Sequence, residues 1–188
     1  EKMYGLDPHA SPDFPQIVDQ RNVSRIEALF AGEDVVYGGD VDIDDRYIAP
    51  TVVRNPSRDS PLMTEEIFGP VMPVIPFSDI DEELDCIVDG EKPLATYIFT
   101  EDRKTADRIL NRVSSGGACI NDTLTHVSVG RAPFGGVGQS GIGCYHGYDS
   151  YAAFTHRRTV LTRSTAFDPS FLYPPYSATK EKIVKKIV

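Results

Sequence analysis

Residues 94–121 have the sequence LATYIFTEDRKTADRILNRVSSGGACIN, in which several signals for secondary structure follow one another. The mostly apolar residues 94–100 are typical of a buried strand, and residues 102–113 have the spacing of a helix. The serines and glycines at 114–117 end that helix, and residues 118–121 favour another short strand. A strand, a helix and a strand in this order indicate a crossover between parallel strands.

The alternation of helices and strands extends towards the N-terminus, after a proline-rich loop at 1–14. Helices are expected at 15–31, which Gly32 ends, and at 79–88, and strands at 35–37, 47–54 and 71–77. Pro50 inside the second strand indicates an edge or an irregular stretch. The first helix is expected to have one apolar face, formed by Ile17, Val18, Ile26, Leu29 and Phe30. The fold class is therefore predicted as α/β, with a largely parallel sheet and crossover helices.

The C-terminal part of the chain is less regular. Residues 131–148 are dominated by glycine and are expected to form mostly loop, followed by a short helix at 150–155 and a final strand at 160–162. Residues 180–188 are basic and amphipathic, with an apolar helical face that consists of Ile183, Val184, Ile187 and Val188.

Composition narrows the class of protein. The chain has 188 residues, of which 40% are hydrophobic and 25% charged, as in an ordinary globular protein. A net charge of −9 argues against a nucleic acid partner. No apolar run approaches the roughly 20 residues that span a bilayer, and no signal-peptide pattern opens the chain. The cysteines form no CxxC pattern, which favours a reducing, intracellular location, and the histidines lack the spacing of a metal site.

Residues 136–141, GVGQSG, match the glycine pattern of a dinucleotide-binding loop. That pattern binds pyrophosphate when it follows a strand and opens a helix, and the preceding residues 131–135 are not a central strand. The following glycines, Gly143 and Gly147, suit a helix poorly. The pattern therefore indicates a tight loop in which backbones approach each other closely.

Residues 65–71, EEIFGPV, carry adjacent carboxylates two residues before an aromatic ring. Glu65 and Glu66 point in different directions in a strand or turn and cannot easily share a proton, so an acid–base pair is disfavoured. One carboxylate could instead accept hydrogen bonds from a ribose diol, and the plainer alternative is a solvated loop.

Cys144 and His146 suggest a thiol–imidazole nucleophile by residue type. Side chains two apart rarely meet with the geometry that such a pair needs, so packing is the favoured interpretation.

Several segments together resemble the aldehyde dehydrogenases, and especially their class 3 branch, which includes fatty aldehyde dehydrogenases. The resemblance covers about residues 3–176 and rests on EEIFGPVMPVIPF (65–77), EKPLATYIFT (91–100), SSGGACIND (114–122), PFGGVGQSGIGCYHG (133–147) and FTHRR (154–158). It implies an NAD- or NADP-dependent oxidation of aliphatic or aromatic aldehydes to carboxylic acids through a cysteine thioester.

The resemblance also assigns roles to individual residues. Glu66 matches the glutamate that hydrogen-bonds the nicotinamide ribose, and Phe68 matches the aromatic at the nicotinamide end. The positions that match the wall of the class 3 substrate funnel are Leu124, Ser128, Phe134, Tyr145 and His146. Their mixture of aromatic, aliphatic and small groups suits an apolar aldehyde.

The resemblance further implies that this chain is the C-terminal portion of such an enzyme. No catalytic residue is expected in it, because the nucleophilic cysteine and the general-base glutamate would lie before Glu1. None of Cys86, Cys119 or Cys144 occupies the place of the nucleophile. The isolated chain is therefore expected to be inactive.

The resemblance divides the chain into part of the catalytic domain (1–158), an oligomerisation strand (159–166) and a C-terminal tail with a gatekeeper helix (167–188). The expected partners are the aldehyde, the rest of the parent chain and a second subunit bound through 159–164. A C-terminal extension could attach the parent to an intracellular membrane, and otherwise a cytoplasmic location is expected.

Two alternatives remain open at this stage. One is a non-enzymatic module of the same fold that serves as a structural part or a subunit interface. The other is a semialdehyde dehydrogenase, whose short, charged substrate would call for a basic group in the funnel, with Arg131 as the nearest candidate.

Overall fold

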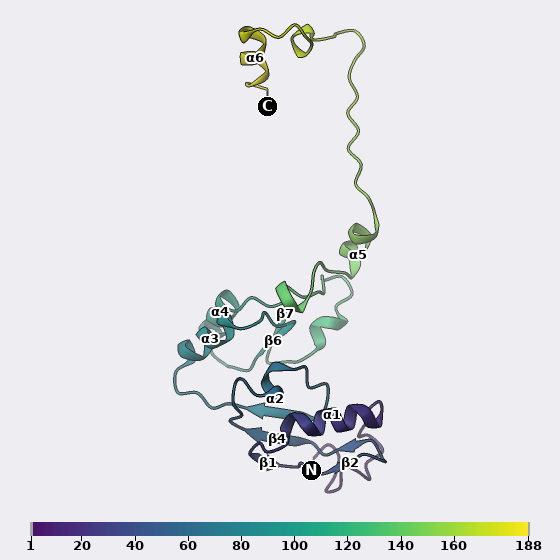
Figure 1. Cartoon of the computed structure of the whole chain (residues 1–188), viewed down its shortest axis with the longest axis vertical. Coiled ribbons are helices and arrows are strands. Elements are labelled where there is room, and N and C mark those ends of the chain that lie inside the picture. The colour runs from purple at the N-terminus through teal and green to yellow at the C-terminus, as the bar shows by residue number, and fades with distance from the viewer. Residues whose placement is uncertain (1, 188) are drawn as a thin grey trace. The chain divides into compact units, whose positions relative to one another are not determined.

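The structure is a computed structural model that describes residues 2–187. It divides into two compact units, Glu1–Asp89 and Gly90–Val188, whose elements are labelled in Figure 1. The helices of the first unit are α1 (Gln20–Phe30), α2 (Pro61–Thr64) and α3 (Ile80–Asp89), and its strands are β1 (Val35–Tyr37), β2 (Val41–Asp42), β3 (Tyr47–Ile48), β4 (Thr51–Arg54) and β5 (Val71–Val74).

The first unit is built around a mixed sheet with the strand order β1-β4-β5. Strands β1 and β4 are antiparallel, and β4 and β5 are parallel, with α2 between them in the chain. In Figure 1, helix α1 lies beside these strands. The buried core, to which α1, α2, β3, β4 and β5 contribute, consists of Val23, Ile26, Leu29, Phe30, Ile48, Val53, Leu62 and Val71. Burial of such side chains typically contributes about 1.5–3 kcal/mol each to folding.

Helix α1 begins later than the predicted residue 15. The Asp19 carboxylate accepts a hydrogen bond of 2.7 Å from the Asn22 amide, which caps the first turn. Val18 therefore lies before the helix and is exposed, contrary to its predicted place on the apolar face, whereas Ile17 packs against the core. The end of the helix is as predicted, with Gly32 in the left-handed region at φ 83°.

The predicted strand at 47–54 is two strands in the structure. Pro50 separates β3 from β4, which confirms the irregular stretch expected there. Strand β3 pairs with β2 in a separate antiparallel ladder, and β2 was not predicted. The α/β class is confirmed, but the strands form several small sheets with antiparallel as well as parallel pairs.

Strand β5 is the last strand of the mixed sheet. Its register places Thr51 opposite Val71 and Val53 opposite Pro73. Because Pro73 has no backbone N–H, it fits an edge strand better than a central one.

The second unit contains a parallel pair joined by a helix, as predicted. Its strands are β6 (Ala95–Ile98) and β7 (Gly117–Ile120), and its helices are α4 (Arg103–Arg112), α5 (Gly147–Phe154) and α6 (Ala178–Val184), with short 3-10 helices η1 (Thr125–Ser128), η2 (Gly138–Ser140) and η3 (Ser170–Leu172). The Asp102 carboxylate accepts hydrogen bonds from the amides of Lys104 and Thr105 and so caps α4. Tyr97 lies opposite Cys119 in the parallel register.

The last part of the chain differs in one respect from the prediction. Residues 160–162 form no strand in the structure, because a strand requires a ladder of hydrogen bonds to a neighbour and the described residues supply none there. The predicted amphipathic helix corresponds to α6, which ends at Val184. Ile187 lies beyond it, and Val188 lies outside the described residues. No helix between residues 2 and 187 has the length and apolar character to cross a membrane.

Candidate functional site

The segment at 65–70 forms an exposed loop between α2 and β5 in the first unit. The Glu65 amide donates to the Pro61 carbonyl at 3.0 Å and ends α2. Glu65 and Glu66 both have exposed side chains. Phe68 is 79% exposed and adopts a left-handed backbone with φ 49°. A bulky residue in this conformation is unusual and must be held by its surroundings.

The loop is held by helix α1. One guanidinium nitrogen of Arg25 donates to the Glu66 carbonyl at 3.0 Å, and the other donates to the Ile67 carbonyl at 2.8 Å. The next residue of the helix, Ile26, packs under Gly69, where an added Cβ would lie 2.8 Å from the Ile26 Cδ1 atom. Arg25 and Ile26 thus fix the backbone of the loop while the Glu66 and Phe68 side chains point to solvent.

In the second unit, an aromatic cluster forms at the ends of the glycine-rich loop. Phe134 and Tyr145 exchange two backbone hydrogen bonds of 2.9 Å, and their ring centroids lie 5.8 Å apart in an edge-to-face arrangement. The His146 ring lies 4.5 Å from that of Tyr145 and stacks on Phe134 at 5.9 Å. The structure therefore brings together three of the residues predicted to line the substrate funnel.

The remaining two predicted funnel residues are the residue before η1 and the last residue of η1. Leu124 precedes this helix with a left-handed φ of 63° and is 67% exposed, and the Ser128 hydroxyl donates to the Thr125 carbonyl at 2.7 Å. Between them, η1 brings the His126 ring to 5.8 Å from Phe134 and 5.9 Å from Tyr97. Leu124 and Ser128 thus border the cluster through the short helix that carries His126.

Sequence reasoning did not find Arg25, Tyr97 or His126. The contact of Arg25 spans more than 40 residues and leaves no local pattern. The position of His126 had a signal, because its loop directly follows β7, and ligands in α/β folds bind beyond the carboxyl ends of parallel strands.

The glycine-rich segment 136–141 is a tight loop, as predicted. A Cβ on Gly136 would lie 2.0 Å from the Ser140 carbonyl oxygen, so the backbones meet at this point. Ser140 closes the loop, because its hydroxyl lies 2.9 Å from the Val137 amide nitrogen.

The structure disfavours Cys144 as a nucleophile. Partial desolvation by neighbouring atoms raises the pKa of its thiol, and the Asp149 carboxylate raises that pKa further. Another thiol does meet an imidazole, because the Cys119 Sγ atom lies 3.3 Å from the His126 Nδ1 atom. Asp122 lies at the same loop, and a hydrogen bond from the Thr125 hydroxyl lowers the pKa of its carboxyl group.

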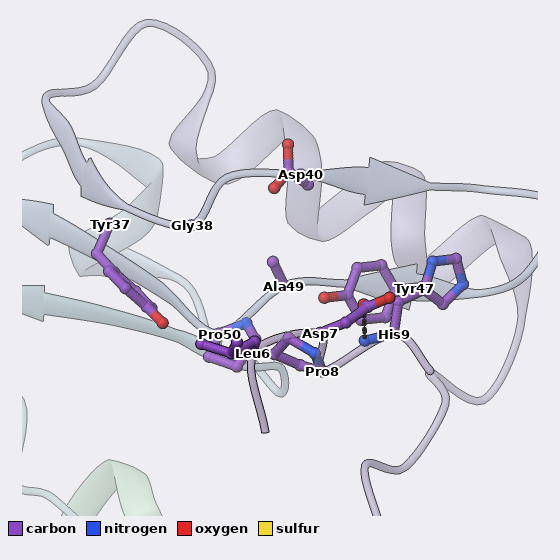
Figure 2. A pocket seen from close by; sticks show the side chains of 10 residues that line it. All are labelled: Leu6, Asp7, Pro8, His9, Tyr37, Gly38, Asp40, Tyr47, Ala49 and Pro50. Carbon is purple, nitrogen blue, oxygen red and sulfur yellow. Dashed lines mark hydrogen bonds between the residues drawn. The ribbon is translucent and has the colours of Figure 1, made fainter. Parts of the chain in front are cut away.

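The first unit also has a hollow of about 460 Å³, which Figure 2 shows from close by. The rings of His9 and Tyr47 stack there at 4.1 Å. Burial raises the pKa of Tyr47, and the carboxylates of Asp7 and Asp40 raise it further. Because these carboxylates border the hollow, it repels phosphates and does not suit a nucleotide.

The described residues, 2–187, contain no cluster of metal ligands. Within this part of the chain, no group of three or more His, Cys, Asp or Glu side chains has the arrangement to hold a metal ion.

Comparison with known proteins gives these features a context. Residues 15–160 match the sequence model of the aldehyde dehydrogenase family. The chain belongs to this family. Both the loop at 65–70 and the aromatic cluster lie within the matched residues of this aldehyde dehydrogenase segment.

Aldehyde dehydrogenase family 3 member H1 of Arabidopsis thaliana is 41% identical over 192 residues, which cover 100% of the chain and 40% of the relative. The structure of a Staphylococcus aureus AldH in a substrate-bound state matches the chain with a TM-score of 0.85 and 40% sequence identity. The match covers 99% of this chain and 41% of the AldH chain. A Mycobacterium tuberculosis aldehyde dehydrogenase complexed with NAD+ has a TM-score of 0.73 at 27% identity, over 81% of the chain and 33% of that structure. The chain thus spans about 40% of the length of the curated relatives that it matches.

Proposed function

We propose that the protein to which this chain belongs oxidises aliphatic or aromatic aldehydes to carboxylic acids with NAD or NADP. The chain supplies the contacts to the nicotinamide ribose and part of the wall of the aldehyde site. The observation that carries this proposal is the loop at 65–70, whose backbone is fixed by Arg25 while the Glu66 carboxylate remains exposed.

The residues of this loop fit a nicotinamide ribose. The Glu66 carboxylate can accept hydrogen bonds from the ribose hydroxyls, and charge-assisted bonds of this type are among the stronger ones. The exposed Phe68 ring offers an apolar surface beside it. Bound in this way, the nicotinamide would supply the acceptor for the hydride. An error of about 1 Å in such positioning can slow a reaction about a hundredfold.

The aromatic cluster of Phe134, Tyr145 and His146 fits the other substrate. Its rings present a largely apolar surface, which favours medium- or long-chain aliphatic or aromatic aldehydes over charged ones. The side chains of Leu124 and Ser128 would extend this surface. The exposed Leu124 would contact the hydrocarbon part of the aldehyde.

The covalent chemistry is assigned to the rest of the parent. A cysteine thiolate would attack the aldehyde carbon, and after loss of the hydride a glutamate would activate water to hydrolyse the thioester. We place both groups in a segment that precedes Glu1, because the motifs of this chain resemble the later part of the class 3 enzymes. The isolated chain is then inactive.

Sequencing the gene on both sides of the encoded chain tests this placement. A segment with the nucleophile upstream of Glu1 supports it, and a nucleophile encoded after Val188 contradicts it. Oxidation of hexanal by the purified chain with NAD+ would contradict the assignment of the thiol and the base to another segment.

Replacement of Glu66 by glutamine in the parent enzyme tests the ribose contact. The carboxamide keeps the size of the side chain but loses its charge, so we expect weaker cofactor binding and slower single-turnover formation of NADH. Arg21→Ala, an exposed change on α1, serves as the control. Unchanged cofactor affinity and an unchanged hydride-transfer rate in Glu66→Gln would refute the role of Glu66.

The assembly of the parent is a separate proposal. Residues 159–164 have no ladder partner among residues 2–187 and would pair with a second subunit to form a homodimer. Sedimentation of the parent enzyme with Leu161→Pro tests this, because proline removes a backbone donor from the ladder. A variant that stays dimeric would contradict the proposal.

The location of the parent is proposed as intracellular, in the cytoplasm or on the surface of an intracellular membrane. The basic, amphipathic α6 supports membrane attachment near this end of the chain. Fractionation of cells that express the parent tests the location. A parent found only in the soluble fraction would contradict attachment, and a secreted parent would contradict the location as a whole.

A further inference from the structure

A thiol–imidazole pair lies beside the aromatic cluster and has no part in the proposed oxidation. The Cys119 Sγ atom lies 3.3 Å from the His126 Nδ1 atom. Strand β7 supplies the half-buried cysteine, and the following 3-10 helix supplies the histidine. This distance is within the range for a hydrogen bond that involves sulfur, so the thiol can donate its proton to the imidazole.

The imidazole is held in place by its surroundings. A Cβ at Gly117 would lie 2.6 Å from the His126 Cδ2 atom and 2.9 Å from its Nε2 atom, so glycine alone leaves room for the ring at this distance. Tyr97 and Phe134 contact the ring through aromatic interactions at 5.9 and 5.8 Å. The Nε2 atom is buried and has no hydrogen-bond partner among residues 2–187. The Cys119 Sγ atom is therefore the polar partner that the ring has in this structure.

The titratable groups that the structure brings near the pair are Tyr97 and Asp122. Tyr97 lies opposite Cys119 on the neighbouring strand. The Thr125 hydroxyl lies 3.9 Å from the Cys119 Sγ atom and donates to an Asp122 carboxylate oxygen at 2.7 Å. The pKa of the Asp122 carboxyl is lowered by this hydroxyl and by the Thr123 amide, so Asp122 is ionised at neutral pH.

The other two cysteines provide an internal comparison. The pKa of the Cys144 thiol is raised by desolvation and by Asp149, which reduces its thiolate fraction. Cys86 lies on the exposed surface of α3, near an arginine, Arg58, that already forms an ion pair with Glu83. Among residues 2–187, a hydrogen bond to an imidazole is found for Cys119 and for neither of these two thiols.

We propose that Cys119 is a second nucleophilic thiol, activated by His126, and that it is a modification site for α,β-unsaturated aldehydes. The sulfur forms a bond to the β-carbon of the enal as the carbon–carbon double bond gives its electron pair to the α-carbon. The thiol proton passes to His126 Nδ1 and then to the α-carbon, so that the adduct is a saturated thioether aldehyde. The step needs no oxidant or reductant.

The enal as reagent rests on the proposed function, because the pair adjoins the aromatic surface assigned to aldehydes. The reactivity of the thiol does not rest on it. A neutral Michael acceptor that is not an aldehyde reports on the thiol alone. If it labels Cys119 and the enal does not, the choice of reagent is wrong and the reactivity of the thiol is still supported.

The test is site-resolved labelling of the 188-residue chain with acrylamide and, separately, with 2-hexenal, followed by mass spectrometry of the cysteine peptides. We expect acrylamide to label Cys119 at pH 7 about ten times faster than Cys144, because the His126 imidazole can accept the Cys119 proton. 2-Hexenal should give a stable thioether on Cys119, whereas saturated hexanal should give none. Equal acrylamide rates at the two thiols would refute the activation of Cys119.

The role of the imidazole is tested by His126→Gln, which keeps a hydrogen-bonding side chain but removes the base. It should lower the rate at Cys119 about tenfold and leave Cys86 and Cys144 unchanged. His156→Gln, an exposed change, is the matched control. If His126→Gln fails to fold by circular dichroism, unfolding of the unaltered chain decides instead. Unfolding in urea separates Cys119 from His126, so the labelling rate of Cys119 relative to that of Cys144 should fall, and an unchanged ratio would refute the proposal.

Discussion

Arg25 is the residue whose removal tests most directly how the loop at 65–70 is positioned. We predict that Arg25→Ala lowers the free energy of unfolding of the first unit and releases the loop. The guanidinium makes two hydrogen bonds to backbone carbonyls, of 3.0 Å to Glu66 and 2.8 Å to Ile67. The first is solvent-exposed and the second is partly buried.

Hydrogen bonds to charged groups typically contribute about 1.5–3 kcal/mol each, and exposure to water reduces this value. Because one bond is exposed and both carbonyls can bind water once the arginine is gone, we expect a loss of about 2 kcal/mol in the free energy of unfolding. Arg25→Lys should lose about half of that, because an ammonium group cannot bind two carbonyls in the fixed fork of a guanidinium.

The assay is urea unfolding followed by circular dichroism, combined with hydrogen exchange of the peptide at 61–71. Exchange separates a local release of the loop from a general loss of stability, since the core strand β4 should remain protected in the same sample. Arg21→Ala, an exposed change on the same helix, is the control and should lie within about 0.5 kcal/mol of the unaltered chain. If Arg25→Ala matches this control in both measurements, the two hydrogen bonds of Arg25 do not hold the loop.

Three further predictions concern the packing of the first unit and the cap of helix α4. Leu62→Ala should lower the free energy of unfolding by about 2–5 kcal/mol, because Leu62 is 1% exposed in the core. Urea unfolding measures this loss. Gly69→Ala should cost about 1–3 kcal/mol through overpacking against Ile26, with thermal unfolding as the measurement, and an unchanged melting temperature would refute the contact. The Asp102 pKa is lowered by the Thr105 hydroxyl and by amides of α4, so the stability that this carboxylate contributes is present above the ordinary pKa of an aspartate and is lost as pH falls through the lowered one. Asp102→Asn should therefore flatten the loss of thermal stability below about pH 4, where an ordinary aspartate titrates, and an unaltered acid profile would contradict this.

Elements with a local signal could be predicted from the sequence. Helix α4 has a capping aspartate, Asp102, and an apolar spacing that agree with each other, and the strands on either side of it were placed to within about two residues. The break at Pro50 was also expected, because proline cannot take part in a continuous ladder. The start of α1 was missed because the Asp19 cap outweighs the apolar residues that precede it.

The candidate site was only partly predictable, for a physical reason. Its residues come together through contacts between distant segments, such as the pairing of Phe134 with Tyr145 or the clamp of Arg25 on the Glu66 carbonyl. Resemblance to the family identified Glu66, Phe134 and Tyr145 by their motifs, but not Arg25. The pair of Cys119 and His126 required the structure, because it depends on the left-handed turn at Leu124 that precedes η1.

The proline in β5 has a consequence for the behaviour of a partial chain in solution. The Thr51 amide donates to the Pro70 carbonyl and the Asn55 amide donates to the Val74 carbonyl, so residues 70 and 74 turn their hydrogen-bonding groups towards β4. Along a parallel strand this direction alternates from one residue to the next. In that alternation, residue 73 faces the open side of the sheet, where proline offers no donor. A further strand from another molecule would meet a gap in its ladder at this position. Pro73 therefore opposes edge-to-edge aggregation along β5 when the chain is produced alone.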